Sequence, residues 1–137
     1  MSDPVGQARV PRQLISSGGP FEVAAGYSRA IVVGDSCWVA GTTDAGPGGI
    51  SQHPGDVAEQ ARAALAIIEA ALVEGGFALA DVVRTRMFVV DIADAGIVTQ
   101  VHGETFGEIR PAATLVAVGA LMDPTLLVEI EAEARRG

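Results

Sequence analysis

The feature that most constrains this chain is a strict alternation near its C-terminus, where apolar residues and glutamates take turns. Val128 and Ile130 alternate with Glu129, Glu131 and Glu133. Because successive side chains of a β-strand point to opposite faces, this segment is predicted to be a strand with one apolar and one acidic face. Like charges so close repel one another unless water, a partner chain or a ligand intervenes. The alternation therefore predicts a sheet with one buried face and a positioned carboxylate on the other.

A long helix is predicted to pack against a sheet of this kind. Asp56 can cap its first turn, Glu59 stands three residues later as in a capping box, and Gly75-Gly76 can end it. Small and aliphatic side chains recur every three or four residues and form one stripe: Ala61, Ala64, Leu65, Ile68 and Leu72. The alanines of this stripe would let the helix lie close to the sheet.

The remaining elements follow from shorter patterns. Residues 30–33 and 37–40 flank Gly34-Asp35 and predict a hairpin, and residues 41–55 predict a loop. Residues 82–90, 114–118 and 126–134 predict further strands, with an extra strand possible at residues 12–15. A second helix within residues 93–106 is expected to bury Val98, Val101, Thr105 and Phe106. This order, without a repeat or a linker, predicts one domain over residues 1–137, an α+β or α/β sandwich.

The segment at residues 115–118 predicts an oligomer. All four side chains are apolar, as expected for a strand that meets water on neither face. Two helices can cover only one face of the sheet, and no segment of the chain remains to cover the other. Self-association is the economical way to cover it.

Charge and composition exclude several classes of function. The formal net charge is −8 and aromatic residues make up 4% of the chain, so a nucleic-acid partner is not expected. No apolar segment reaches the roughly 18–20 residues that span a bilayer, and the N-terminus lacks the pattern of a secretory signal. The single Cys37, interpreted as a small buried hydrophobe, favours a cytoplasmic, reducing location.

Four segments follow, in order, the pattern of a known family. Tyr27-Ser28-Arg29-Ala30 stands where that family has Pro-Tyr-Ser-Gln-Ala, and Val39-Ala40-Gly41-Thr42 where it has a Ser-Gly-Gln strand end. Residues 56–62, 75–76 and 81–83 follow its first helix and next strand, and Arg110-Pro111-Ala112 with Val128-Glu129-Ile130-Glu131-Ala132 its C-terminal signature. Over residues 27–134 the chain thus resembles RidA, also called YjgF, the reactive-intermediate (enamine/imine) deaminases. The resemblance implies a chorismate-mutase-like α+β fold, with one mixed sheet, two helices on one face, and a homotrimer with ligand clefts between subunits.

The resemblance also implies roles for single residues. Glu129 matches the glutamate that helps to position the attacking water, and Tyr27 matches the tyrosine that lines the cleft. The family arginine that binds the substrate carboxylate follows the Pro-Ala pair, and this chain has Ala113 there. Thr114 could supply part of the lost anion binding or could simply build the strand. Arg86 could be a displaced anion clamp, or it could form an ion pair with an acid of the last strand or of a neighbouring subunit.

No metal or cofactor is expected. His53 and His102, the only histidines, lack the spacing of a metal set. The glycine-rich residues 46–49 lack the lysine and the pattern of a phosphate-binding loop.

Three functions remain open at this point. The first is a cofactor-free imine or enamine deaminase with an altered substrate range. The second is a non-catalytic trimeric protein that binds a small molecule. The third and weaker alternative is a ribonuclease, a label that some members of the family carry.

Overall fold

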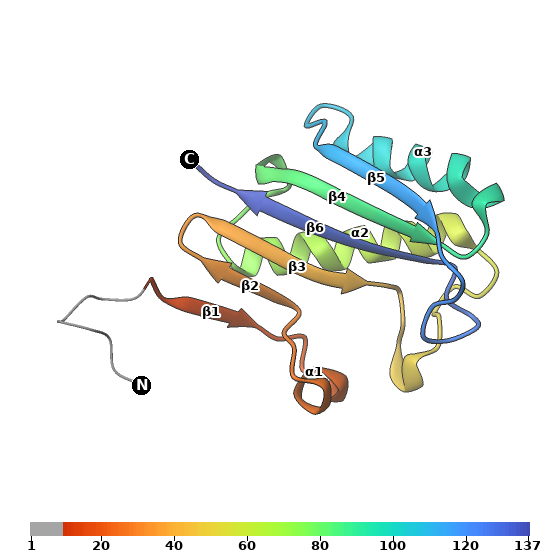
Figure 1. The fold of residues 1–137 in the computed structure, drawn as a ribbon, viewed down its shortest axis with the longest axis horizontal. Helices are drawn as coiled ribbons and strands as arrows, with labels where there is room; N and C mark the ends of the chain where they lie inside the picture. Colours follow the sequence, from red (N-terminus) through yellow and green to blue (C-terminus); the bar gives the residue numbers. More distant parts are fainter. Residues whose placement is uncertain (1–9) are drawn as a thin grey trace.

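The computed structural model describes residues 10–137, which form one six-stranded mixed sheet with helices on one side (Figure 1). The strands are β1 Arg12–Ile15, β2 Ala30–Val33, β3 Ser36–Thr42, β4 Val82–Val89, β5 Ala112–Ala117 and β6 Val128–Arg135. Their order across the sheet is β1-β2-β3-β6-β4-β5. Only β4 and β5 run parallel. The alternating segment of the sequence, β6, thus lies in the interior of the sheet, paired on both sides.

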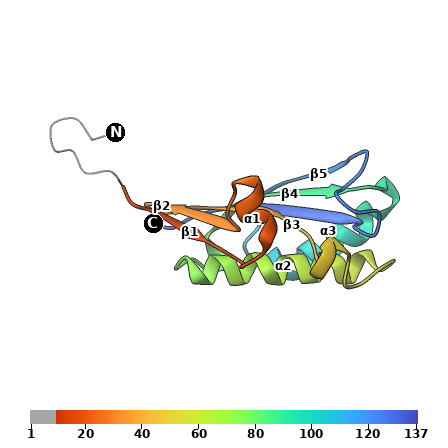
Figure 2. The same ribbon diagram turned by 90° about the horizontal axis from the view of Figure 1, so that it is seen from below.

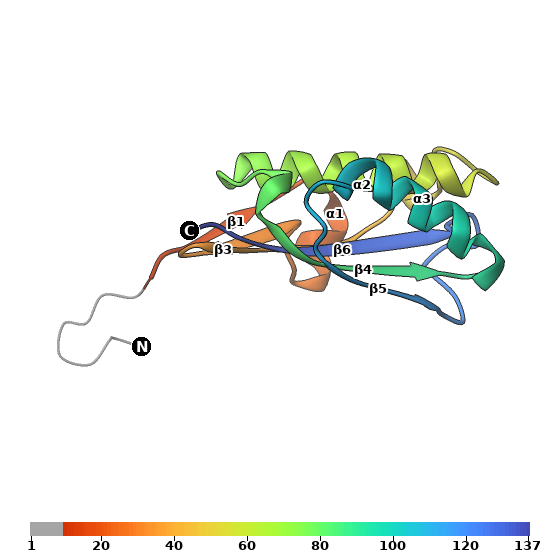
Figure 3. The same cartoon turned by 90° about the horizontal axis from the view of Figure 1, so that it is seen from above.

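Two helices, α2 Val57–Glu74 and α3 Ala95–Phe106, cover one face of the sheet and leave the other open (Figures 2 and 3). The α2 helix begins as predicted, because the side chain of Asp56 accepts a hydrogen bond from the backbone N–H of Glu59 (3.1 Å). All five residues of the predicted α2 stripe are buried. On α3 three of the four predicted inward residues are buried, and Thr105, in the last turn, is only partly buried.

The predicted α+β class, with one mixed sheet and two helices on one face, is confirmed, and so is the strand at residues 12–15. Strand ends differ by a few residues from the prediction: β5 begins at Ala112 because it continues to pair with β4 as far as Arg84. Short 3₁₀ turns complete the described elements: η2 Pro47–Gly49, η3 Leu79–Asp81 and η4 Ile92–Asp94.

A short helix that the sequence analysis did not predict, α1 Pro20–Ala25, connects β1 to β2 at the end of the sheet (Figure 1). Six residues are too few to produce a clear helical period. Side-chain contacts hold it in place: buried Glu22 accepts hydrogen bonds from Ser16 Oγ (3.0 Å) and from the backbone N–H of Ser17 (3.1 Å). The carbonyl of Glu22 accepts a bond from the N–H of Tyr27 (2.9 Å), so α1 positions Tyr27 just before β2.

The open face is acidic in the middle and partly apolar elsewhere. On β6, Val128 and Ile130 are buried beneath the helices while Glu129, Glu131 and Glu133 are only partly buried on the open face, as the alternation predicts. The edge strand β5 is mostly exposed within one chain, and its Val116 is 42% exposed. In the described part of the chain, no helix has the length and apolar character needed to cross a membrane.

Candidate functional site

The open face is interrupted by a bulge between β3 and β6. Val39 pairs with Ala132 and Thr42 with Ile130, so three steps along β3 match only two along β6. Val39 and Thr42 are buried, whereas the two residues between them are partly exposed. A bulge of this kind inserts an extra residue, bends its strand and re-aims nearby side chains. The extra residue lies in the segment Ala40-Gly41, in the middle of the open face.

Gly41 leaves the space that the Glu129 side chain occupies. A Cβ at position 41 would overlap Glu129 Oε2 and lie 3.1 Å from Cδ and 3.5 Å from Cγ. Only a residue without a side chain therefore fits under this carboxylate unless Glu129 moves. On the other side of β6, Glu129 pairs with Phe88 of β4, so β3 and β4 together fix its place on the sheet.

Arg29 reaches Gly41 from the β2 side of β3, whereas Glu129 lies on the β6 side. Its backbone continues the sheet at the start of β2: its N–H donates to Ile15 O (2.8 Å), and its carbonyl accepts from Ala40 N–H (2.9 Å). Its guanidinium Nη2 donates to Gly41 O (2.6 Å). Arg29 and Glu129, which are far apart in the sequence, thus both contact the bulge residue Gly41.

Burial perturbs both charged groups. Removal from water raises the pKa of Glu129; the positive charge of Arg29 opposes this rise, and the nearby Glu131 adds to it. Burial also lowers the pKa of Arg29, while Tyr27, Glu22 and Glu129 act in the opposite direction. A carboxyl group with a raised pKa can accept and return a proton near neutral pH more readily than an ordinary glutamate.

Tyr27 stands two residues after the end of α1, close enough to Arg29 to influence its pKa, and 45% of its surface is exposed. It borders a shallow groove of about 530 Å³ on the open side of β1, β2 and β3. Apolar side chains line much of this groove, among them Leu14, Ile31 and Trp38. Ala40, the first residue of the bulge segment, also lines the groove.

Ala113 and Thr114 lie far from Tyr27 within one chain. They belong to β5, and three strands, β3, β6 and β4, separate β5 from β2. At roughly 4.8 Å per strand, this places them about 19 Å from β2. Thr114 lies in register with Arg86 and accepts a hydrogen bond from Arg84 Nη2 (2.6 Å), whereas Ala113 lies in register with buried Thr85. The predicted site residues therefore do not meet at one point of a single chain. They are Tyr27, Arg86, Ala113, Thr114 and Glu129.

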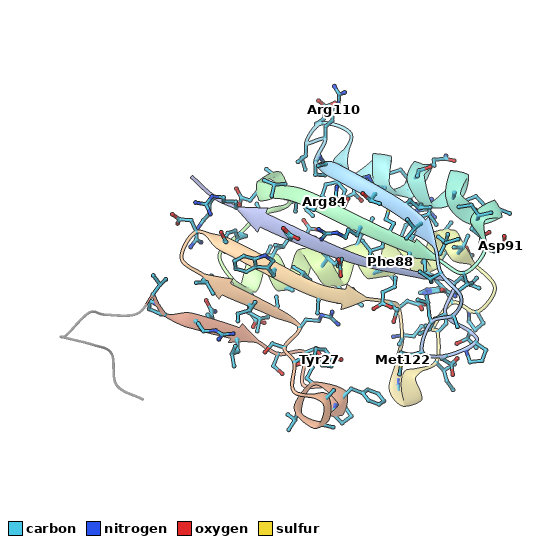
Figure 4. All side chains as sticks on the ribbon, in the orientation of Figure 1. Tyr27, Arg84, Phe88, Asp91, Arg110 and Met122 are labelled. Carbon is cyan, nitrogen blue, oxygen red and sulfur yellow. The ribbon has the colours of Figure 1, made fainter. Side chains whose placement is uncertain are left out.

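Arg86, considered above as a displaced anion clamp, and Arg110, the arginine that precedes β5, have other surroundings. Arg86 Nη1 forms ion pairs with Glu131 (3.3 Å) and Glu133 (2.9 Å). Within one chain, Arg86 thus forms the ion pair with acids of the last strand that was the alternative to an anion clamp. Its positive charge partly neutralises Glu131 and Glu133 of β6. Arg110 adopts a positive φ of 55° before β5, and Figure 4 places it at the opposite end of the molecule from Tyr27.

The histidines and the cysteine lie outside this site. His53 Nδ1 is 3.1 Å from Asp44 Oδ2 in the loop after β3, and His102 Nε2 is 2.8 Å from Thr85 Oγ1. Cys37 is buried, as predicted, and burial raises the pKa of its thiol. Within residues 10–137, no three His, Cys, Asp or Glu side chains are grouped as a metal site would require.

Comparison with known proteins decides the family. The profile described as Endoribonuclease L-PSP matches residues 19–136, nearly the whole chain. The chain belongs to the RidA/YjgF family. The crystal structure of Rv2704 from Mycobacterium tuberculosis, a member of the YjgF/YER057c/UK114 family, is 49% identical and superposes with a TM-score of 0.84. That comparison covers 92% of this chain and 100% of the Rv2704 chain.

Two relatives carry names that state an activity. The chain is 34% identical over 125 residues to the 3-aminoacrylate deaminase RutC of Acinetobacter baylyi. The matched segment covers 91% of this chain and 98% of RutC. It is 32% identical over 126 residues to the 2-iminobutanoate/2-iminopropanoate deaminase of Rattus norvegicus, covering 92% of this chain and 91% of the relative. At the level of the family, these relatives support a RidA-like deaminase.

Two residues of this RidA/YjgF site were missed by the sequence analysis, Arg29 and Gly41. Both stand inside the quoted family segments, yet neither was assigned a role. A signal existed for Arg29, because the RidA opening motif has glutamine where this chain has arginine. For Gly41 the sequence offered no comparable signal, since the need for glycine comes from the Glu129 side chain across the sheet.

Proposed function

We propose that this RidA/YjgF protein hydrolyses small reactive imines or enamines and releases ammonia. The observation that carries the proposal is the half-buried carboxylate of Glu129, held over Gly41 beside Arg29. The names of the relatives supply the reaction class, and the departure at Ala113 indicates a substrate range that differs from theirs.

The proposed reaction needs water and side chains of the chain, and it balances without a redox step. Glu129 orients a water molecule and accepts one of its protons while the oxygen attacks the C=N carbon. The imine nitrogen takes up this proton, which gives a neutral carbinolamine; an enamine is first converted to its imine by moving a proton from nitrogen to carbon. The carbinolamine collapses as its hydroxyl proton passes by way of Glu129 to the nitrogen, the C–N bond breaks and a C=O bond forms, so that a carbonyl compound and ammonia leave. Because burial raises the pKa of Glu129, the proton can be held and returned within one turnover.

A homotrimer with clefts between subunits is part of the same proposal. Tyr27 and β5 are about 19 Å apart in one chain, so a neighbouring subunit would have to bring its β5 to the Tyr27 groove. The open face offers apolar area for such a contact, including Trp38 at 43% and Val116 at 42% exposure. We expect a solution mass of three times 14.0 kDa by light scattering; a monomer that remains active would contradict the shared cleft.

The direct test uses an imine made in situ from an amino acid by an oxidase. The decay of the imine is measured with and without the protein, together with ammonia release. The wild type is expected to accelerate the decay, and Glu129→Gln is expected to fall to the rate in buffer. If the wild type accelerates neither charged nor uncharged imines, the proposal of a deaminase is wrong.

A non-catalytic binding protein is the second candidate, and the observation in its favour is Ala113. If the wild type is inactive while Ala113→Arg gains ammonia release, the scaffold is competent and substrate choice alone has changed. If Ala113→Arg binds the carboxylate but stays inactive, the binding role is favoured. The ribonuclease alternative has least support, because a net charge of −8 opposes binding to a phosphate backbone. A cytoplasmic location, expected from the single Cys37, completes the proposal.

A further inference from the structure

We propose that Arg29 is an anion-binding residue, which holds a carboxylate or similar planar anion of the ligand beside Glu129. Identifying this ligand as an imino acid rests on the proposed function. The binding site itself rests on the guanidinium group and its surroundings.

The guanidinium of Arg29 is largely without partners. Of its three nitrogens, Nη2 donates to Gly41 O (2.6 Å), and Nε is buried without any hydrogen-bond partner. Nη1 also lacks a hydrogen-bond partner among residues 10–137, and it is not among the fully buried atoms. Guanidinium groups bind carboxylates through pairs of parallel N–H donors. Arg29 keeps such donors available.

Glu22 and Glu129 act on the charge of Arg29 only from a distance. In the described part of the chain, no carboxylate oxygen lies within the 4.0 Å salt-bridge distance of its guanidinium nitrogens. The acidic neighbours offset the burial of this charge only in part, and an anion in direct contact with the guanidinium would reduce the remaining penalty. Two other arginines of the open face are engaged: Arg84 donates to Thr114, and Arg86 pairs with two glutamates.

The sequence shows an exchange of charge between two positions. The family opening has glutamine at position 29 and an arginine at position 113, whereas this chain has Arg29 and Ala113. The positive charge has thus been lost from β5 and gained at the start of β2. Its new place is in the same subunit as Glu129 and Tyr27, so the anionic end of the ligand would point toward the β2–β3 side of the site.

A stable ligand tests this site without any turnover. A 2-oxo acid, the carbonyl product of imine hydrolysis, is titrated calorimetrically against the wild type, and its uncharged amide is the matched probe. The wild type is expected to bind the acid more tightly than the amide. Arg29→Gln, which restores the family residue, is expected to lose about ten- to hundredfold in affinity for the acid and little for the amide. Arg135→Gln removes one exposed positive charge elsewhere and serves as the control.

One further variant, Arg29→Lys, separates ligand binding from a structural role. Arg29→Lys keeps the charge and can still donate to Gly41 O, so it is expected to retain folding and part of the preference for the acid. If Arg29 only supports the bulge, acid and amide will weaken together in Arg29→Gln. Equal affinity of the wild type for acid and amide, or an unchanged preference in Arg29→Gln, would overturn the proposal.

The outcomes also distinguish this site from the proposed function. If the acid binds through Arg29 but no imine is hydrolysed, the anion site stands and the deaminase proposal fails. If imines are hydrolysed and Arg29→Gln leaves the ratio of kcat/KM between charged and uncharged imines unchanged, the deaminase stands and the anion site fails.

Discussion

Replacing Gly41 by alanine should impair catalysis far more than folding. The new methyl group overlaps Glu129 Oε2 and lies 3.1 Å from Cδ, where ordinary contacts begin near 3.4 Å. The carboxylate must therefore retreat by about 1 Å. Gly41 does not have a positive φ, so its backbone accepts alanine.

The two costs can be compared. Overpacking against a side chain that can rotate away costs about 1–3 kcal/mol at most, partly offset by about 0.4–1 kcal/mol from the less flexible unfolded chain. A catalytic group displaced by about 1 Å costs on the order of 10²-fold in rate. We therefore expect kcat to fall about a hundredfold while the thermal midpoint falls by about 10 °C at most.

The assay is ammonia release from an imine formed in situ, together with thermal unfolding. Gly103→Ala is the matched control: a Cβ there meets nothing within 4 Å, and Gly103 lies in α3, away from the site. This control should keep its rate and gain up to about 1 kcal/mol from the better helix propensity of alanine. In a Glu129→Asp background the shorter side chain should remove the stability cost of Gly41→Ala.

Two results would refute the reasoning. If Gly41→Ala keeps the wild-type rate, the position of Glu129 over the bulge does not matter for catalysis. If its stability cost is the same in the Glu129→Asp background, the overlap with the carboxylate is not the cause.

Three further outcomes are expected. Gln60→Leu should destabilise the protein by about 2–4 kcal/mol, measured by denaturant unfolding, because this buried amide bonds the backbone of His53 before α2 and of Thr125 and Leu127 before β6. An unchanged midpoint would mean that those backbone groups reach water in the variant. Burial raises the pKa of Glu129, so this group favours folding at low pH and loses that contribution as the pH rises through its folded pKa. Glu129→Gln should therefore be thermally more stable than the wild type at neutral pH, but not at a pH below 4.5, the ordinary pKa of a glutamate. An equal gain in stability at these two pH values would contradict the prediction. Arg86→Met leaves Glu131 and Glu133 without their partner, so added salt should stabilise it more than the wild type; equal salt responses would argue against repulsion on β6.

The local elements of the fold could be predicted because their signals are local. The alternation around Ile130 defines a strand and its buried face, and Asp56 and Gly75 mark the ends of α2. The short α1 escaped prediction because contacts of Glu22 with Ser16 and Ser17, rather than a hydrophobic period, hold it.

The candidate site was only half predictable. Tyr27 and Glu129 stand in recognisable motifs, and the sequence alone revealed that position 113 lacks its arginine. The sequence could not reveal that Arg29 lies near Glu129 without a direct ion pair, because that depends on which strands become neighbours.

The sequence by itself determined which segments are strands and helices, which face of β6 is acidic, and to which family the chain belongs. Tertiary structure alone decided that one extra residue in β3 places Gly41 beneath Glu129 and beside Arg29. It also decided that Tyr27 and Thr114 lie on opposite sides of that point. The physical reason is that side-chain periodicity is a property of each strand, whereas register and strand order arise only when segments distant in the sequence pair.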